Sequence, residues 1–433
     1  MAEREKGYRK ETVLIHGKFR TAKWDYIHHV IPPLTKSTTF RLDSTQRGHE
    51  GFMSFNSPLV AREDEPPVYV YDRLGEPTID MLEDMMKEAE GGEAGVAFSC
   101  GMSAISTTLL VLNQAGTKIV AHRTLYGCTY SLLSKWLPRY GIKTQFIDLT
   151  DIEALKAAIT PETRVVYTET PANPTLEVVD LEKVRGVIDD INRTRKKEEK
   201  VWLVVDNTFA TPWAQRPLEH GADIVVESLT KNVGGFGVDM GGMAVVPAEL
   251  IPDLKLLRKD LGGVLSPSAA WNIMVFGLGT LALRMRRQQE TALKVAKFLE
   301  SQDIISKVHY PGLESFPYRE AAMKQMRDPY GEFAPGIMIY FEFGGDLDLA
   351  RRRSQTFVDT IAAEAYSITM AVSLGMTKTL LEAPGLMTHS ALPPEEQSKA
   401  GIHPGGVRMS IGIEHPDDLI RDLENALNKA KAV

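Results

Sequence analysis

The chain has 433 residues, of which 43% are hydrophobic and 25% charged, and its formal net charge is −7 at pH 7. This length is enough for two or three domains, and the acidic balance argues against a nucleic-acid partner. Two cysteines, Cys100 and Cys128, are too few for a disulfide framework or a thiolate metal site, so we expect a cytoplasmic location. No run approaches the roughly 18 apolar residues of a membrane span, so we expect no membrane partner.

Residues 1–75 are predicted to form an extended N-terminal arm. The pair Pro32-Pro33 and a Gly/Ser/Pro-rich run over residues 47–67 do not have the pattern of a packed domain. Such a segment wraps another subunit or covers a site, and disorder of its middle is the alternative. His28 and His29 are adjacent, so they cannot share one helix face at ligand spacing, and we predict no metal site.

Residues 76–265 are predicted to form the large domain, because strand-like runs alternate there with helical ones. Apolar residues at helical spacing between Pro77 and Gly91 predict a helix over residues 78–90. A short strand at 95–98 then leads into the small-residue turn SCGMSA and a helix to residue 112, a turn whose free N–H groups can hold a phosphate. The alternation predicts a mostly parallel sheet built from βαβ units. Further strands are expected at 118–121, 145–149, 164–168, 201–205 and 224–227, and helices at 128–137, 152–159 and 181–191.

Residues 266–433 are predicted to form a helical connection and a smaller C-terminal α/β domain. Apolar helical stretches cover 267–284 and 288–299. From residue 337 the run IMIYFEF predicts a strand, and residues 407–413 alternate strictly, which puts Arg408 on the face opposite the apolar residues. A last helix is expected from Leu419.

Two ionisable residues stand where neighbouring strands are expected to end: Asp206 follows VWLVV, and Lys231 follows ADIVVESLT. In open α/β sheets, ligands bind at the carboxyl ends of the strands. A dehydrated lysine has a lowered pKa and can form an imine, and a buried carboxylate needs a cation such as a protonated pyridine nitrogen. This pattern predicts a Schiff-base lysine paired with Asp206. The alternatives are a surface lysine and a helix N-cap aspartate.

Nucleotide chemistry is not supported by the glycine-rich segments. Residues 235–241, GFGVDMG, are one residue too long for GxGxxG, and no GxxxxGK[ST] occurs. Tyr126 can stack on a planar ring or be an ordinary half-buried tyrosine, and the residues alone leave both open.

From Tyr71 to the end, the chain carries the motifs LYGCTY, CGMSAI, TETPANP, VVDNTFATP, ADIVVESLTK, SLG, MTHS and GGVRMSIGIE. In this combination the sequence resembles the pyridoxal-phosphate enzymes of cysteine and methionine metabolism, the cystathionine γ-synthase-like family. The resemblance implies the PLP-dependent transferase fold type I, pyridoxal 5'-phosphate as cofactor and a small amino-acid substrate. It also implies a homotetramer, a dimer of dimers that share active sites.

The resemblance also implies roles for single residues. Lys231 forms the Schiff base, Asp206 holds the pyridine nitrogen and Tyr126 stacks on the ring. The other implied residues are Gly101, Met102, Ser228 and Thr230 at the phosphate, Asn173 and Thr208 beside the cofactor, Ser373 and Arg408 at the substrate carboxylate, and Tyr71 and Arg73 reaching a neighbouring subunit's phosphate.

The sequence departs from the family pattern around the arm and after Lys231. The departures are Asp72 for serine, Glu76 for asparagine, Glu227 for a common histidine, Asn232 for an aromatic residue, Phe236 for histidine, and an unusually long loop over residues 47–68. They leave the cofactor assignment intact and weaken the substrate assignment.

Cys128, together with Lys259 and Asp260, makes the chain most similar to the methionine γ-lyases of the family. Cys128 is also a candidate substrate contact. The alternative is that Cys128 is a small core residue. Lys378 stands where many relatives have glutamate, and near the site it would disfavour the distal ammonium of cystathionine by about 1 to 4 kcal/mol. We therefore expect γ-elimination from methionine or homocysteine to 2-oxobutanoate, ammonia and a thiol. The alternatives are γ-replacement, as in O-acetylhomoserine sulfhydrylase or cystathionine γ-synthase/lyase, and a cofactor-free interaction protein.

Overall fold

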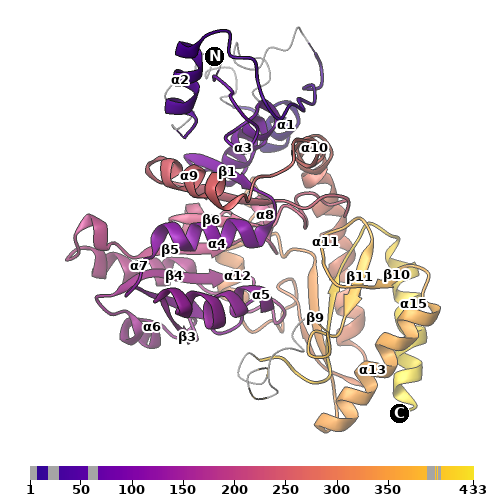
Figure 1. Cartoon of the computed structure of the whole chain (residues 1–433). Helices are drawn as coiled ribbons and strands as arrows, with labels where there is room; N and C mark the ends of the chain where they lie inside the picture. The colour runs from indigo at the N-terminus through magenta and orange to yellow at the C-terminus, as the bar shows by residue number, and fades with distance from the viewer. Residues whose placement is uncertain (1–6, 18–28, 57–66, 388–394, 396, 398–400) are drawn as a thin grey trace.

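The structure, a computed structural model, describes residues 7–17, 29–56, 67–387, 395, 397 and 401–433. In this described part, the chain forms a seven-stranded and a five-stranded sheet. Figure 1 shows the larger sheet and its helices beside the smaller one, with the N-terminal region above the larger sheet. Within the described residues, no helix has the length and apolar character needed to span a membrane.

The larger sheet has the strand order β1-β7-β6-β5-β4-β2-β3. Neighbours from β6 to β3 pair in parallel, whereas β7 runs antiparallel to both β1 and β6. The prediction of a mostly parallel sheet is therefore confirmed, with one antiparallel strand that it missed. The strands are β1 Ala94–Phe98, β2 Lys118–His122, β3 Lys143–Ile147, β4 Thr163–Glu169, β5 Trp202–Asp206, β6 Ile224–Glu227 and β7 Gly242–Val246.

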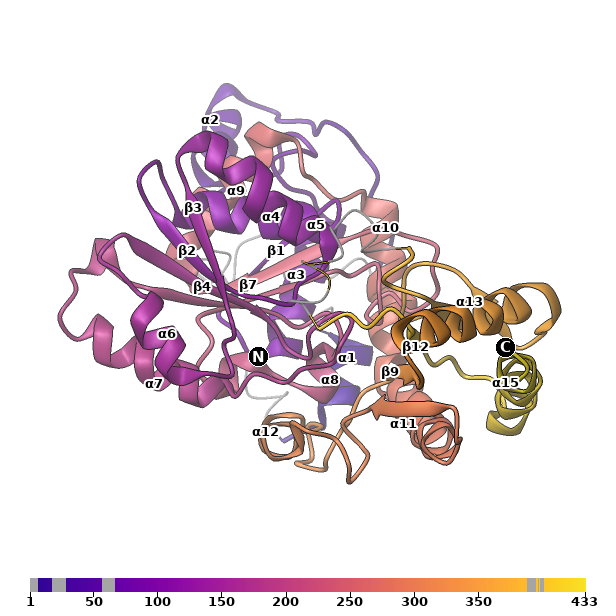
Figure 2. The ribbon, with the colours of Figure 1, turned by 90° about the horizontal axis from the view of Figure 1, so that it is seen from below.

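Helices cover both faces of this sheet, as Figure 2 shows from below. Successive strand residues point to opposite faces, so Val204 of β5 packs in the cluster of α4 and α9, while Leu203 and Val205 pack in that of α6 and α7. This is why β1, β5, β6 and β7 are apolar at nearly every position. The helices are α3 Pro77–Glu90, α4 Gly101–Leu112, α5 Gly127–Ser131, α6 Ile152–Ala158, α7 Leu181–Asn192, α8 Thr211–Ala214 and α9 Ile251–Leu261.

The smaller sheet has the order β10-β11-β12-β9-β8 and is mostly antiparallel. The predicted stretches at 267–284 and 288–299 are one continuous helical run, α10 Pro267–Asn272, the π-helical segment η7 Ile273–Leu278 and α11 Gly279–Glu300. The remaining elements are β8 Ile305–His309, α12 Arg319–Gln325, β9 Met338–Phe343, α13 Leu347–Glu364, β10 Ile368–Met370, β11 Thr379–Glu382, β12 Gly406–Ser410 and α15 Pro416–Lys431.

The N-terminal region is less extended than expected. It contains α1 Lys10–His16 and α2 Thr45–Ser54, and α2 starts where the Ser44 side chain accepts a hydrogen bond from the Arg47 N–H. A serine N-cap supports a helix even in a glycine-containing sequence, which the compositional argument overlooked. His28, residues 57–66 of the long loop and Thr388 to Ser390 of the MTHS motif lie outside the described residues.

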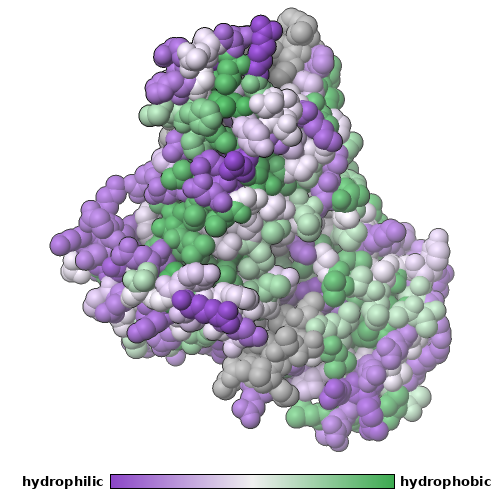
Figure 3. Space-filling view, in the orientation of Figure 1, coloured by the Kyte–Doolittle hydropathy of each residue, from purple (hydrophilic) through white to green (hydrophobic). Residues whose placement is uncertain are grey.

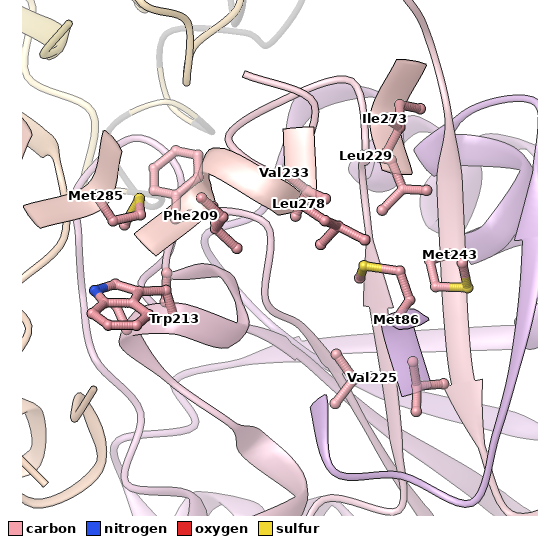
Figure 4. Packing of buried hydrophobic residues seen from close by; sticks show 14 of the residues in the cluster. Met86, Phe209, Trp213, Val225, Leu229, Val233, Met243, Ile273, Leu278 and Met285 are labelled. Atoms are coloured by element: carbon pink, nitrogen blue, oxygen red, sulfur yellow. The ribbon is translucent and has the colours of Figure 1, made fainter. Parts of the chain in front are cut away.

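A buried apolar cluster fixes the segment that follows β6. Leu229 and Val233, two positions to either side of Lys231, are 0% and 1% exposed and pack with Ile273 and Leu278 of the long helical run. Figure 4 shows these side chains pointing into one cluster with Met86 and Met243. Because both flanking residues are anchored in the core, the backbone at Lys231 has a defined position.

Candidate active site

A cavity of about 1020 Å³ opens at the carboxyl edge of the larger sheet, next to the smaller sheet. Twelve of the residues singled out from the sequence line it, a convergence expected where parallel strands end together. They are Gly101, Met102, Tyr126, Cys128, Asn173, Asp206, Thr208, Ser228, Thr230, Lys231, Ser373 and Arg408.

Lys231 points its amine into this cavity. Nζ donates a hydrogen bond of 2.7 Å to the Ser373 hydroxyl, which belongs to the segment between β10 and β11. Burial lowers the pKa of the Lys231 amine from its ordinary value, and the nearby Arg408 guanidinium lowers it further. The amine therefore loses its proton more readily than a surface lysine would.

Asp206 is the last residue of β5, whereas the sequence predicted that the strand ends at residue 205 and that Asp206 follows it. Its Oδ1 accepts a 3.0 Å bond from the Thr208 N–H, and burial raises the pKa of its carboxyl. Among the described residues, no basic side chain forms an ion pair with it. A largely buried carboxylate without a cation fits a ligand that brings one, such as a protonated pyridine nitrogen. The N-cap alternative is not observed, because Asp206 ends a strand and caps no helix.

The N-terminus of α4 faces the end of β6. No side chain caps this helix, so its first N–H groups are available to an anion. A Cβ on Gly101 would lie only 2.8 Å from the Ser228 Cβ, so glycine is needed for the two segments to approach. The Thr208 hydroxyl accepts from the Ser228 N–H at 2.9 Å, which ties this turn to the Asp206 turn. Together these residues form a small polar cradle of phosphate size.

Tyr126 directly precedes α5, and its backbone N–H donates a 2.8 Å bond to Glu169 Oε1. Burial of the ring raises the pKa of the Tyr126 hydroxyl, and a hydrogen bond with Cys128 raises it further. Cys128 is itself exposed at the cavity, so it is not the core residue of the alternative interpretation.

Arg408 lies on β12 and is 3% exposed. Its Nη1 donates to Asn173 Oδ1 at 2.9 Å, and its Nη2 donates to the Ser373 carbonyl at 2.9 Å. Ser373 adopts a φ of 87°, a conformation that costs a non-glycine residue free energy and is found at constrained functional sites. In this conformation the Ser373 hydroxyl meets Lys231 and its carbonyl meets Arg408.

Three predicted residues lie apart from the cavity. Tyr71 is 43% exposed, and Arg73 donates from Nη1 to the Lys259 carbonyl at 2.9 Å. Lys378 is exposed and does not line the cavity, so the charge-repulsion argument against cystathionine is withdrawn.

Two acidic residues of the site escaped the sequence reasoning. Glu169 belongs to the TETPANP motif, but nothing in the sequence indicates that it accepts a hydrogen bond from the Tyr126 N–H. Glu382 ends β11 and forms a 2.9 Å ion pair with Arg408. The signal for Glu382 is the pairing register of β11 and β12, which the sequence alone does not reveal.

Residues 11–428 match the family described as Cys/Met metabolism PLP-dependent enzyme. The L-methionine gamma-lyase of Fusobacterium nucleatum subsp. polymorphum is 40% identical over 399 residues, covering 92% of this chain and 93% of that protein. The cystathionine beta-lyase of Lactococcus lactis subsp. cremoris is 38% identical over 366 residues, covering 84% and 90%. Among solved structures, a cystathionine gamma-lyase from Lactobacillus plantarum has a TM-score of 0.84 at 32% identity, covering 98% of this chain and all of that one.

These findings confirm the predicted fold class and the predicted cofactor. The cavity agrees with them, because it combines a lysine amine, a buried carboxylate without a cation and the open N-terminus of α4. These are the groups that the aldehyde, ring nitrogen and phosphate of pyridoxal phosphate require. The chain belongs to the family of Cys/Met metabolism PLP-dependent enzymes.

Proposed function

We propose that this enzyme catalyses γ-elimination from methionine or homocysteine to 2-oxobutanoate, ammonia and a thiol. One observation carries the proposal: the Lys231 amine, the Asp206 carboxylate and the Arg408 guanidinium line one cavity. Identity of 40% to an L-methionine gamma-lyase over 92% of the chain supports the substrate class. The exposed Cys128 in the same cavity is a further point of similarity to such enzymes.

The cofactor would be held by residues that the structure brings together. Lys231 would bind it covalently through Nζ, Asp206 would face the ring nitrogen, and the N-terminus of α4 with Ser228 and Thr230 would face the phosphate. Asn173, Thr208 and the Tyr126 ring would border the cofactor. When bound, pyridoxal phosphate supplies an electron sink that stabilises negative charge on the substrate Cα.

Each remaining task falls to a residue of the chain. Lys231 moves protons at Nζ, because burial lowers its pKa and leaves more of the amine neutral near pH 7. Ser373 holds Nζ in place through its hydroxyl. Arg408 binds the substrate carboxylate, which is why a buried guanidinium lies at the cavity wall. Tyr126 keeps a proton on its hydroxyl, since burial raises its pKa.

A γ-replacement reaction is the second candidate. The cavity of about 1020 Å³ lies at the upper end of the usual size of ligand sites, about 300 to 1000 Å³, so a second substrate has room beside the cofactor. Because Lys378 lies outside the cavity, its charge does not argue against a cystathionine-like substrate.

The assay supplies purified enzyme with methionine alone, and then with O-acetylhomoserine and sulfide. We expect 2-oxobutanoate and methanethiol from methionine, and no product from a Lys231→Ala variant. Homocysteine from the second mixture, without 2-oxobutanoate from methionine, would replace elimination by γ-replacement. A protein that stays colourless after addition of pyridoxal phosphate would contradict both and favour an interaction protein.

The assembly that we infer is a homotetramer whose dimers share active sites. Tyr71 and Arg73 lie outside their own chain's cavity, which is expected if they serve a neighbouring one. Leu283 and Phe276, on the long helical run, are 71% and 49% exposed, and Figure 3 shows apolar residues gathered over α4.

Mixing inactive Lys231→Ala and Arg73→Ala subunits should recover activity, because a mixed dimer has one intact site. No recovery after verified subunit exchange would refute shared sites.

The predicted division at residues 75 and 265 remains part of this proposal. Every strand of the larger sheet falls between residues 94 and 246, and every strand of the smaller one between 305 and 410. The cytoplasmic location is proposed from the two reduced cysteines.

A further inference from the structure

Glu382 forms a buried ion pair with the arginine that we assign to the substrate carboxylate. The two side chains are 1% and 4% exposed, and the Oε1 to Nη2 distance is 2.9 Å. Their closeness follows from register, because β11 and β12 are antiparallel and Glu382 stands directly opposite Arg408. Directly opposite residues of antiparallel strands have Cβ atoms about 4.5 to 5.5 Å apart on the same face.

The hydrogen bonds of Arg408 show what this pair does to the guanidinium plane. Nη2 has two hydrogens, and they are directed to the Ser373 carbonyl and to Glu382. Nη1 uses one of its two hydrogens for Asn173 Oδ1. A guanidinium has five N–H donors, and the contacts among the described residues leave the second Nη1 hydrogen and the Nε hydrogen available to a ligand. The Ser373 carbonyl, Glu382 and Asn173 Oδ1 accept from two different nitrogens and thus fix the orientation of the guanidinium plane.

We propose that Glu382 is a positioning residue for substrate recognition, which holds the Nη2 edge of Arg408 so that a remaining N–H donor of the guanidinium meets the α-carboxylate of an amino acid. The inference rests on the carboxylate-binding role proposed for Arg408. It assigns to Glu382 no contact with the substrate. The acceptor atom and its reach are what matter in this role, and the negative charge is secondary.

The charge and the position of Glu382 have opposite effects on substrate binding, which makes the proposal testable. As a charge, Glu382 opposes the binding of a second carboxylate beside Arg408, so its removal would tighten binding. As an acceptor, it fixes the guanidinium, so its removal would weaken binding. Glutamine keeps the reach of the side chain and loses the charge, whereas aspartate keeps the charge and loses the reach by one methylene.

The test measures ligand binding to the holoenzyme rather than turnover. L-Norleucine has a methylene in place of the methionine sulfur and therefore no leaving group on its γ-carbon. n-Pentylamine is the same molecule without the carboxylate and serves as the matched control ligand. Both are titrated by calorimetry into wild type, Glu382→Ala, Glu382→Asp, Glu382→Gln and Arg408→Ala, and thermal unfolding with the cofactor's visible absorbance checks that each variant is folded and loaded.

We expect Glu382→Ala and Glu382→Asp to raise the norleucine Kd about tenfold or more, which corresponds to about 1.4 kcal/mol. Glu382→Gln should stay within about threefold of wild type, since its amide oxygen still accepts from Nη2. The pentylamine Kd should stay constant in the Glu382 variants, because that ligand has no carboxylate to contact Arg408. Should Glu382→Ala fail to fold, the aspartate and glutamine pair still decides the question.

Tighter or unchanged norleucine binding by Glu382→Asp would overturn the positioning role. Equal weakening of norleucine and pentylamine would also overturn it, because a general loss of packing affects both ligands. If Arg408→Ala leaves norleucine binding unchanged, the carboxylate-binding role of Arg408 is refuted. If Arg408→Ala weakens norleucine binding but Glu382→Ala and Glu382→Asp do not, only the positioning role of Glu382 is refuted.

Discussion

Replacing Glu76 by glutamine tests whether burial keeps a carboxyl protonated near neutral pH in the segment that joins the arm to α3. Glu76 is 1% exposed and is the N-cap of α3. Its Oε1 accepts from the Ile79 N–H at 2.7 Å, and its Oε2 accepts from the Thr35 hydroxyl at 2.6 Å. Burial outweighs these hydrogen bonds and raises the pKa of Glu76 to about 7.

The magnitude follows from the difference between the folded and unfolded pKa values of Glu76. A rise from 4.5 to about 7 corresponds to about 3 kcal/mol at about 1.4 kcal/mol for each pKa unit. Because the folded pKa is the higher one, the folded state binds the proton more tightly. This stabilisation is fully present below about pH 4.5 and is lost as the pH rises through about 7.

The assay is urea unfolding of wild type and Glu76→Gln from pH 5 to pH 8, followed by tryptophan fluorescence. Glutamine keeps an oxygen that accepts from Ile79 and has no proton to lose. Wild type should therefore lose up to about 3 kcal/mol relative to Glu76→Gln over this range. Asp346→Asn is the control, because Asp346 is the exposed N-cap of α13. It measures how the loss of a carboxylate charge at an unburied N-cap changes the unfolding free energy. Parallel stabilities of wild type and Glu76→Gln at every pH would refute the reasoning.

Two further predictions concern the frame of the site. Gly101→Ala places a Cβ 2.8 Å from the Ser228 Cβ, so we expect pyridoxal phosphate to dissociate about tenfold more readily, while Gly279→Ala, whose Cβ meets open space, leaves the Kd unchanged. Leu229→Ala and Leu423→Ala each remove a side chain that is 0% exposed and should each cost about 2 to 5 kcal/mol of unfolding free energy. Only Leu229→Ala should also alter the visible absorbance of the bound cofactor, because Leu229 anchors the backbone at Lys231; equal spectra for the two variants would contradict this.

Much of the site could be predicted because its residues follow apolar runs. Asp206 and Lys231 come at or just after the ends of β5 and β6, and parallel strands place their carboxyl ends at one edge. The turn before α4 was recognised from its small residues, and Arg408 from the strict alternation of its strand. In each case the local pattern and the overall architecture give the same answer, which is why the sequence predicted that these residues lie together.

What could not be predicted depends on contacts between distant segments. The Ser373 conformation, with φ at 87°, has no marker in SLG beyond the glycine at 375. Glu382 reaches Arg408 only through a register that places two strands side by side. β7 was missed because its sequence, GMAVV, is too short to be distinguished from part of a buried helix. Its antiparallel direction arises because the chain returns between β1 and β6. Pairing of this kind is decided by packing rather than by local propensity.

The segment after Lys231 is one of the two regions that depart from the family pattern, and its contacts show how its backbone is held. Arg284, on α11, donates from Nη1 to the Asn232 carbonyl at 2.8 Å and from Nη2 to the Val233 carbonyl at 3.2 Å. Burial lowers the pKa of Arg284 to about 10, so it remains a cation at neutral pH. These bonds hold backbone atoms, whereas the Asn232 side chain donates to the Thr208 and Phe209 carbonyls and a Cβ at Gly235 would lie 2.2 Å from Arg284 Nη1. The backbone directly after Lys231 is therefore fixed from the side of α11, whereas Met240, which is 66% exposed, lines the cavity.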